Sequence, residues 1–368
     1  MIDVNNFFSF LKKNKIEFFS GVPDSVLKDT KEVFEKMSNK NHVVATNEGV
    51  ATSVCIGNYL ATGNLPCVYL QNSGLGNAVN PLISVAHKKV YSIPLLLLIG
   101  WRGAPGSKDE PQHIVKGKIT KKLLTNMGIR YCELINKKDL NKLKKLITYS
   151  KKNKAPIACL VKKNILFKSK KNKKIYKNSG IKRGLFIEKF LETIDKKTKI
   201  ISSTGYISRE LHQIRKNNKI NLGKDFYMVG GMGHSSSVAL GFSINKSKNK
   251  VICLDGDGAL LMHLGSMANV GFYGNKNFKH IVLNNNCHES VGGQKTNMEK
   301  VKLKQISLGL GYKNYSSLSL DNKIVSTLKN FLRKKGPSLL EVKIQTGSIN
   351  YLTRPKNLIL VKNNFMKK

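Results

Sequence analysis

The sequence lacks any apolar run long enough to cross a membrane. Its longest candidates, such as Ile93–Gly100, have the length of a buried strand, whereas a membrane-spanning helix needs about 20 apolar residues. The N-terminus lacks the basic start and the apolar core of a secretory signal peptide. From these absences we expect a cytoplasmic protein that has no membrane partner.

Cysteine is scarce and shows no pairing in the sequence. None of the six cysteines belongs to a CxxC motif, and most lie in apolar runs, where cysteine behaves as a small hydrophobic residue. We therefore expect buried free thiols. Metal binding by thiolates has little support.

Acidic residues are few: 22 Asp and Glu stand against 64 Lys and Arg, which gives a formal net charge of +42. Such a balance raises the question of nucleic-acid binding. The lysines are spread over the whole length, however, and they rarely alternate with aromatic residues, which disfavours a nucleic-acid groove. We expect no nucleic-acid partner and a positive field that attracts an anionic substrate.

The chain, at 368 residues, has room for two domains. Apolar strand-like runs alternate with helical patterns in both halves, which predicts an α/β fold with two doubly wound parallel-sheet domains. A Lys- and Asn-rich stretch breaks this pattern. We expect one domain over 1–167, a basic linker over 168–183, and a second domain over 184–368 whose tail beyond Thr346 has no assigned structure. The predicted strands are Ile16–Ser20, Val43–Thr46, Pro66–Leu70, Ile93–Ile99, Ile157–Val161, Lys199–Ser202, Phe226–Val229, Val251–Leu254, His280–Leu283 and Leu339–Ile344.

Polar residues follow two neighbouring strands of the second half. The turn Gly256-Asp257-Gly258 comes directly after a strand and before a helix expected from Ala259, and its glycines let backbone N–H groups approach an anion. Asn285 follows the next strand, 28 positions after Asp257. A lone Gly-Asp-Gly more often caps a helix, but the asparagine favours a site for Mg²⁺ and a diphosphate.

A second candidate position is Glu48 in the first half. The segment Thr46-Asn47-Glu48-Gly49 ends a strand and opens a helix of small and apolar residues. A glutamate in the first turn can simply favour the helix dipole. Small apolar neighbours are instead typical of a buried carboxylate, whose neutral form is favoured and which can share a proton with a ligand.

These segments resemble those of the thiamine diphosphate enzymes, in which Gly-Asp-Gly is followed at about this distance by a pair of asparagines. Within that group, the chain resembles the phosphonopyruvate decarboxylases, with the sulfopyruvate decarboxylases as close relatives. The resemblance covers about residues 7–366, without the middle domain of larger 2-oxo acid decarboxylases. The segments that carry it are Gly21–Leu27, Asn47–Gly49, Tyr59–Gly63, Gln71–Asn77, Gly100–Gly106, Asp109–His113, Ser203–Gly205, Ser208–Leu211, Gly231–His234 and Asn284–Gln294.

The resemblance implies a pyrimidine-binding first domain, a diphosphate-binding second domain, and thiamine diphosphate and Mg²⁺ as cofactors. It implies decarboxylation of 3-phosphonopyruvate to phosphonoacetaldehyde and CO₂, a step of phosphonate biosynthesis. Sulfopyruvate decarboxylation, or decarboxylation or carboligation of another 2-oxo acid, is the alternative. The family also implies a homo-oligomer, at least a dimer, in which Glu48 and Asp257 at one cofactor come from different subunits.

The resemblance also assigns roles to single residues. Glu48 would hydrogen-bond a pyrimidine nitrogen, while Asp24 and His113 would form the polar catalytic pair beside the reacting centre. Asp257 and Asn285 would bind the metal, joined by the backbone carbonyl of Cys287. The further cofactor-binding residues are Ser203, Thr204, Gly231, Met232, Gly256, Gly258, Ala259 and His288, of which Met232 would wedge between the two rings of the cofactor. The candidate substrate contacts are Ser25, Asn72, Ser73, Arg102, Ser290, Lys295 and Arg354.

Overall fold

The computed structural model describes residues 1–168, 179–218 and 225–367, which divide into two compact units. The first unit holds the described residues up to Lys168 together with Val291–Gln294, and the second holds the others. Lys168 pairs with Glu32 inside the first unit. Most of the linker predicted over 168–183 lies outside the described residues, so the domain boundaries stay a prediction.

The first unit is built on a six-stranded sheet in which all neighbouring strands are parallel. The strand order is β3-β2-β4-β5-β7-β6, and a separate two-stranded pair joins β1 (Ile2–Asp3) to β8 (Leu166–Phe167). The six strands are β2 (Phe19–Gly21), β3 (His42–Val44), β4 (Cys67–Gln71), β5 (Leu96–Gly100), β6 (Arg130–Leu134) and β7 (Ile157–Val161).

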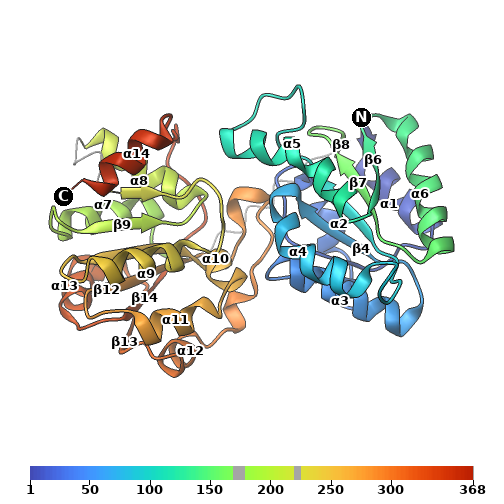
Figure 1. The fold of residues 1–368 in the computed structure, drawn as a ribbon. Helices are drawn as coiled ribbons and strands as arrows, with labels where there is room; N and C mark the ends of the chain where they lie inside the picture. The colour runs from blue at the N-terminus through green and yellow to red at the C-terminus, as the bar shows by residue number, and fades with distance from the viewer. Residues whose placement is uncertain (169–178, 219–224, 368) are drawn as a thin grey trace. The chain divides into compact units, whose positions relative to one another are not determined.

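Helices cover both faces of this sheet because the side chains of each strand alternate between two apolar cores. In β4, Cys67 and Tyr69 pack into one core, while Val68 and Leu70 pack into the other. Figure 1 shows α1 and α6 on one side of the sheet and α3 and α4 on the other. The helices of the first core are α1 (Val4–Lys13), α2 (Lys31–Glu35) and α6 (Leu140–Asn153), and those of the second core are α3 (Glu48–Thr62), α4 (Leu75–Pro81) and α5 (Pro111–Asn126).

The second unit repeats this plan. Its parallel sheet has the order β10-β9-β11-β12-β14-β13, and helices again lie on both faces. The strands are β9 (Lys199–Ser202), β10 (Asp225–Tyr227), β11 (Val251–Gly256), β12 (Phe278–Asn284), β13 (Asn314–Leu318) and β14 (Ser338–Lys343). One core receives α7 (Arg183–Thr193), α8 (Tyr206–Asn217) and α13 (Ile324–Arg333), and the other receives α9 (Ser235–Asn245), α10 (Asp257–Met262), α11 (Ser266–Tyr273), α12 (Leu303–Gly309) and α14 (Leu358–Met366).

Both sheets have the same strand order when their strands are numbered along the chain: 2-1-3-4-6-5. In doubly wound sheets, ligands bind beyond the carboxyl ends of the strands, at the point where the strand order reverses. That point lies between β2 and β4 in the first unit and between β9 and β11 in the second. The predicted site residues should therefore be sought at these two edges.

The predicted fold class is confirmed, and all ten predicted strands overlap observed ones. The sequence analysis missed β6 and β13, which are edge strands at equivalent places in the two sheets. Both carry half-buried or exposed side chains at several positions, so neither has the continuous apolar run of a central strand. The C-terminal helix α14, where no structure was assigned, was missed as well.

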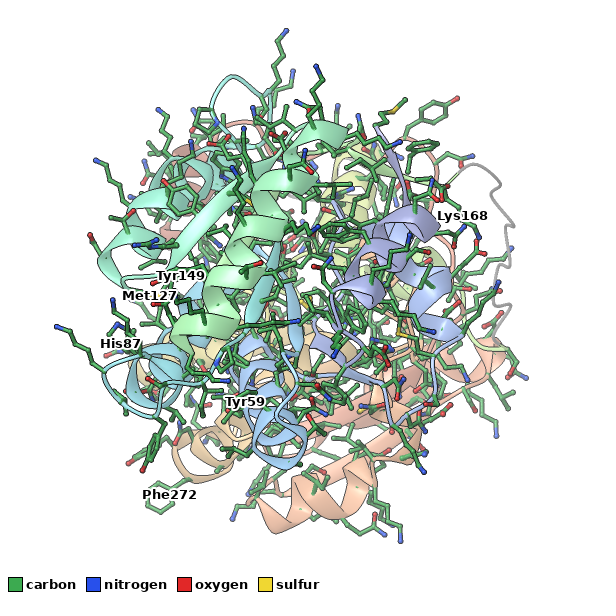
Figure 2. The ribbon with its side chains drawn as sticks, turned by 90° about the vertical axis from the view of Figure 1, so that its right-hand side faces the viewer. Tyr59, His87, Met127, Tyr149, Lys168 and Phe272 are labelled. Atoms are coloured by element: carbon green, nitrogen blue, oxygen red, sulfur yellow. The ribbon has the colours of Figure 1, made fainter. Side chains whose placement is uncertain are left out.

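The cysteines are free thiols, as the sequence predicts. All six cysteines are free thiols; five are buried, and Cys287 is half-buried. Many nitrogen-tipped side chains project outward in Figure 2, and on the first unit Arg130 lies 4.1 Å from the ring centre of Tyr149. None of the helices in the described ranges is both long enough and apolar enough to span a membrane.

Candidate active site

Glu48 is a buried carboxylate at the start of α3. Its neighbour Asn47 caps the helix, with Oδ1 accepting from the backbone N–H of Val50 at 2.9 Å. The Glu48 side chain is 5% exposed, and its Oε2 accepts from Nδ2 of Asn77 at 2.7 Å. Burial raises the pKa of Glu48, and the Asn77 hydrogen bond offsets only part of this effect. Burial thus shifts Glu48 toward its neutral form, which is the direction that proton sharing with a ligand requires.

Gly74 leaves the space in which the Glu48 carboxylate lies. A Cβ added at Gly74 would overlap Oε1 and Cδ of Glu48. We expect Gly74→Ala to displace the carboxylate and to lower turnover by about 100-fold, because misplacement by about 1 Å can cost that much. Gly76→Ala is the matched control, since a Cβ there meets no atom within 4 Å. Steady-state kinetics of both variants would test this, and equal activity would contradict the expectation.

Asp24 is the second buried carboxylate of this edge and lies just beyond β2. Its side chain is 2% exposed, and its Oδ2 accepts from the backbone N–H of Leu27 at 3.1 Å. A Cβ added at Gly100, the last residue of β5, would overlap Oδ2. Burial raises the pKa of Asp24 to about 6, although backbone N–H groups and Arg102 oppose the shift. Asp24 is therefore more than an exposed turn residue.

Asp24 should make the stability of the protein depend on pH. The folded-state pKa of Asp24, about 6, exceeds the ordinary value of 3.8, so the folded chain holds this proton more tightly than the unfolded chain does. The contribution of Asp24 to the free energy of unfolding is therefore lost as pH rises from about 4 through about 6. We expect Asp24→Asn to raise the free energy of unfolding at pH 7.5 by about 1–2 kcal/mol, while having little effect at pH 4. Urea unfolding at both pH values measures this. Glu17→Gln, at an exposed position, is the control, and a less stable Asp24→Asn protein at pH 7.5 would refute the expectation.

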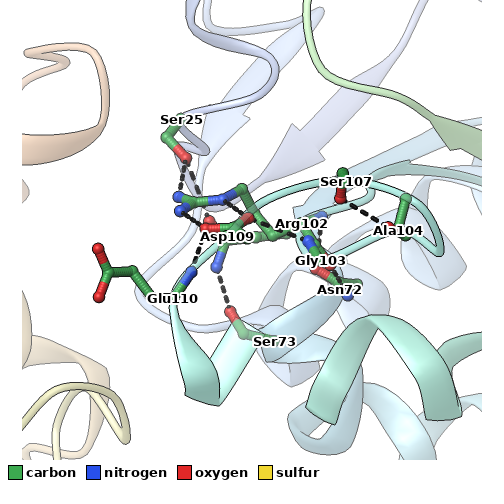
Figure 3. A network of polar contacts seen from close by, with 10 residues as sticks. Ser25, Asn72, Ser73, Arg102, Gly103, Ala104, Ser107, Asp109 and Glu110 are labelled. Atoms are coloured by element: carbon green, nitrogen blue, oxygen red, sulfur yellow. Dashed lines mark hydrogen bonds and ion pairs between the residues drawn. The ribbon is translucent and has the colours of Figure 1, made fainter. Parts of the chain in front are cut away.

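Four predicted substrate contacts come together at the same edge, as Figure 3 shows. Asn72 donates to the backbone carbonyl of Arg102 at 2.9 Å and accepts from its backbone N–H at 3.1 Å. Arg102 Nη1 donates to Ser25 Oγ at 3.0 Å, and Ser25 in turn contacts Gln71, whose amide donates to Ser73 at 2.6 Å. These contacts join the loops that follow β2, β4 and β5.

His113 lies in the first turn of α5 and is half-buried. A Cβ added at Gly103 would overlap the backbone carbonyl of His113, so the start of α5 packs tightly against the residue that follows Arg102. The pairing of His113 with Asp24 in catalysis stays a prediction.

Asp257 is the central carboxylate of the second unit. It is the first residue of α10, and its carboxylate accepts hydrogen bonds from the backbone N–H groups of its own residue and of Gly258. Oδ2 accepts from Thr296 Oγ1 at 2.6 Å, the side chain is 3% exposed, and burial raises its pKa to about 6. The backbone of Cys287 also hydrogen-bonds to this carboxylate. A buried carboxylate is a suitable ligand for a divalent cation.

Asn285 lies at the end of β12, two residues before Cys287. It is 4% exposed; its Oδ1 accepts from the backbone N–H of Cys287 at 3.1 Å, and its Nδ2 donates to Glu289 at 3.2 Å. An amide oxygen is a ligand type that Mg²⁺ accepts. The donor set of Asp257, Asn285 and the Cys287 carbonyl, all oxygen atoms, therefore fits Mg²⁺.

Three close approaches at glycines bring the other loops to this turn. An added Cβ would lie 2.9 Å from His288 Nδ1 at Gly258, 3.1 Å from the Ala259 carbonyl at Gly233, and 3.4 Å from Ser290 Oγ at Gly205. Gly205 directly follows Ser203 and Thr204, which come after β9. The predicted cofactor-binding segments of the second unit thus lie together, and burial lowers the pKa of His288 to about 4, which keeps its ring neutral.

Met232 lies between Gly231 and Gly233, whose φ angles are +63° and +87°. Its side chain is half-buried, so it is not ordinary core filler.

Two predicted substrate cations are less well placed. Lys295 has a side chain that is 63% exposed and that pairs with Glu299 at 4.0 Å, and Arg354 is half-buried in the C-terminal segment.

The sequence analysis missed the partners that hold these groups. Asn77 holds Glu48, Thr296 holds Asp257, and Asp109 holds Arg102. Asn77 and Asp109 belong to segments that carry the family resemblance, which was the available signal. Thr296 carries no such signal.

Comparison with known proteins decides the family. Residues 4–126 match the model of the thiamine pyrophosphate enzyme N-terminal TPP-binding domain, and residues 203–342 match that of the C-terminal TPP-binding domain. The chain is 33% identical to the phosphonopyruvate decarboxylase of Streptomyces viridochromogenes, over 86% of this chain and 81% of the relative. The chain belongs to the phosphonopyruvate decarboxylase family.

Two further relatives are a second phosphonopyruvate decarboxylase and a subunit of a sulfopyruvate decarboxylase. A phosphonopyruvate decarboxylase of Streptomyces hygroscopicus is 29% identical, over 97% of this chain and 91% of the relative. The sulfopyruvate decarboxylase subunit beta of Methanocaldococcus jannaschii is 32% identical, over 50% of this chain and 96% of that subunit. The resemblance stated from the sequence is confirmed. Both matched models describe TPP-binding domains, so this member of the phosphonopyruvate decarboxylase family uses thiamine diphosphate. Mg²⁺ is the usual partner metal of this cofactor in the family.

Proposed function

We propose that the protein catalyses the thiamine diphosphate- and Mg²⁺-dependent decarboxylation of 3-phosphonopyruvate to phosphonoacetaldehyde and CO₂, in phosphonate biosynthesis. The observation that carries the proposal is the pair of buried carboxylates, Asp24 and Glu48, at the switch point of a sheet in a chain of this family. Decarboxylation of sulfopyruvate is the second candidate, since a sulfopyruvate decarboxylase subunit is also among the relatives.

The residues of the second unit would hold the charged end of the cofactor. Asp257, Asn285 and the Cys287 carbonyl would bind Mg²⁺, while Ser203, Thr204 and the N–H groups of the glycine turn would contact the diphosphate. When bound, thiamine diphosphate supplies an electron sink for the electron pair that CO₂ leaves behind. Met232 would support the bent shape of the cofactor.

The residues of the first unit would manage protons. Glu48, whose neutral form burial favours, would share its proton with a pyrimidine nitrogen. Asp24, with a pKa raised to about 6, would deliver a proton to the carbon from which CO₂ has left, and His113 would assist it. Because proton delivery needs the protonated carboxyl, product release should slow as pH rises above about 6.

The residues around Glu48 and those around Asp257 form one catalytic centre only if both units bind the same cofactor. We propose that a homo-oligomer, at least a dimer, achieves this by joining Glu48 of one subunit to Asp257 of another. The proposed location is the cytoplasm.

The function is tested with purified protein, Mg²⁺, thiamine diphosphate, and either phosphonopyruvate, sulfopyruvate or pyruvate. We expect CO₂ release to be fastest with phosphonopyruvate, with phosphonoacetaldehyde as the product in ³¹P NMR spectra. Release from sulfopyruvate alone would replace the proposed substrate by the second candidate. A product that joins two substrate molecules would indicate carboligation instead.

A further inference from the structure

We propose that Arg102 forms the subsite for the second anion of the substrate, a phosphonate or sulfonate group, and that Asp109 is the residue that orients it. The proposal rests on the proposed function, because it assigns one end of the proposed substrate to a place in the first unit.

Arg102 is fixed at both its backbone and its side chain. Asn72, itself 6% exposed, holds both the N–H and the carbonyl of Arg102 and also donates to Thr120 at 3.0 Å. The guanidinium donates to Asp109 twice, from Nε at 2.7 Å and from Nη2 at 2.5 Å, and to Ser25 from Nη1 at 3.0 Å. Figure 3 shows the contacts that join Arg102 to Asn72, Asp109 and Ser25. A guanidinium held in this way loses little conformational freedom when it binds a ligand.

The way in which Asp109 binds leaves the far edge of the guanidinium available. A guanidinium has five N–H groups. Nε and one hydrogen of Nη2 point to Asp109, and one hydrogen of Nη1 points to Ser25. One N–H of Nη1 and one of Nη2 remain, and they can donate to two oxygens of a phosphonate or sulfonate. The side chain keeps 19% exposure, so part of it can still meet a ligand.

Asp109 is itself held as a positioning residue. It is 10% exposed, and besides the guanidinium it accepts from the backbone N–H groups of Gly103 at 3.0 Å and Glu110 at 2.9 Å. The loop between Arg102 and α5 is thus tied to the carboxylate that orients the guanidinium. The same loop packs against His113, so anion binding and the start of α5 share one rigid segment.

The location suits the chemistry. Ser25, which accepts from Arg102, is adjacent to Asp24, and the charge of Arg102 acts on the Asp24 carboxylate. The anion subsite therefore lies beside the group that would deliver a proton. Lys116 is a half-buried cation of the same unit whose charge acts on Glu48.

The test measures binding of two anions that lack a 2-oxo group, phosphonoacetate and sulfoacetate, to the holoenzyme by calorimetry. We expect wild-type protein to bind at least one of them, and Arg102→Gln to weaken this affinity by about 10- to 100-fold. Arg102→Lys keeps the charge but loses the pair of N–H donors. Its anion affinity should therefore lie between that of wild type and that of Arg102→Gln. Asp109→Asn should weaken binding less than Arg102→Gln. Arg130→Gln, which removes an arginine stacked on Tyr149, should bind like wild type.

Equal affinity of wild type and Arg102→Gln, or no binding by wild type, would overturn the proposal. Circular dichroism checks that each variant is folded. If Arg102→Gln does not fold, the affinity of Arg102→Lys decides the test. CO₂ release by wild type decides the proposed function separately. A protein that releases no CO₂ from phosphonopyruvate, but whose anion affinity depends on Arg102, would keep the subsite and lose the substrate. If Arg102→Gln weakened the affinity for sulfoacetate more than that for phosphonoacetate, the subsite would be assigned to sulfonates.

Discussion

Replacing Glu48 by Gln should lower turnover by about 10²- to 10⁴-fold, the range expected when a positioned acid–base group is lost. The carboxylate is 5% exposed, its neutral form is favoured, and Asn77 fixes one oxygen. Glutamine has nearly the same shape and can keep the Asn77 contact. It cannot give up a proton to a pyrimidine nitrogen, so the loss should reflect chemistry and leave the fold intact.

The measurement is CO₂ release under saturating cofactor, together with calorimetric binding of thiamine diphosphate in the presence of Mg²⁺. Cofactor affinity should change by less than about tenfold, because one hydrogen bond at most is lost. Glu17→Gln is the control, since Glu17 is exposed on the same unit. A Glu48→Gln enzyme with wild-type turnover would exclude the proton-sharing role.

Replacing Asp257 by Asn should weaken Mg²⁺ binding by on the order of 100-fold or more, since loss of even an outer partner of a metal ligand typically costs 10- to 100-fold. Asp257 is the buried carboxylate of the predicted metal set, and Thr296 and the Cys287 backbone already hold its oxygens in place. An amide of the same size removes the negative charge that balances the cation. Cofactor binding should fall in parallel, because Mg²⁺ held by Asp257 would offset the negative charge of the diphosphate.

Thr296 provides a graded comparison for this experiment. Thr296→Ala removes the hydroxyl that donates to Asp257 at 2.6 Å, together with the γ-methyl, so it should weaken Mg²⁺ affinity by about tenfold. Thr296→Ser, which keeps the hydroxyl, should restore the affinity. Titration of the apoprotein with Mn²⁺, followed by electron paramagnetic resonance, reads metal affinity without relying on activity. If Asp257→Asn bound Mn²⁺ like wild type, the metal would have to lie elsewhere.

The central strands and the two key carboxylates could be predicted because local signals mark them. A run such as Val251–Leu254 is apolar throughout and leads directly into glycines, which fixes both the strand and the turn after it. Glu48 follows a strand and precedes small residues, which indicates burial. The edge strand β6 gave no such signal, because Arg130 and Glu133 interrupt its apolar residues.

The contacts that complete the site depend on residues far apart in the chain. Thr296 meets Asp257 across 39 positions, and Asn77 meets Glu48 across 29. Such pairs form only when loops from different strands meet at the sheet edge, and neither composition nor periodicity encodes that meeting. For the same reason, the sequence left Arg102, Lys295 and Arg354 as equal candidates, whereas only burial and the Asp109 contact separate Arg102 from the exposed Lys295.

The shared 2-1-3-4-6-5 strand order has a consequence for redesign. The fold offers the same crevice twice, and the loops give each copy a different role. The second unit carries the predicted metal and diphosphate ligands, and the first carries Arg102 and Asp109 of the proposed anion subsite. The segment after β5 is therefore the place to alter substrate preference, because the residues that position Glu48 lie in the segment after β4. A library confined to residues 102–109 should vary the acid that is accepted and leave the residues around Glu48 and Asp257 unchanged.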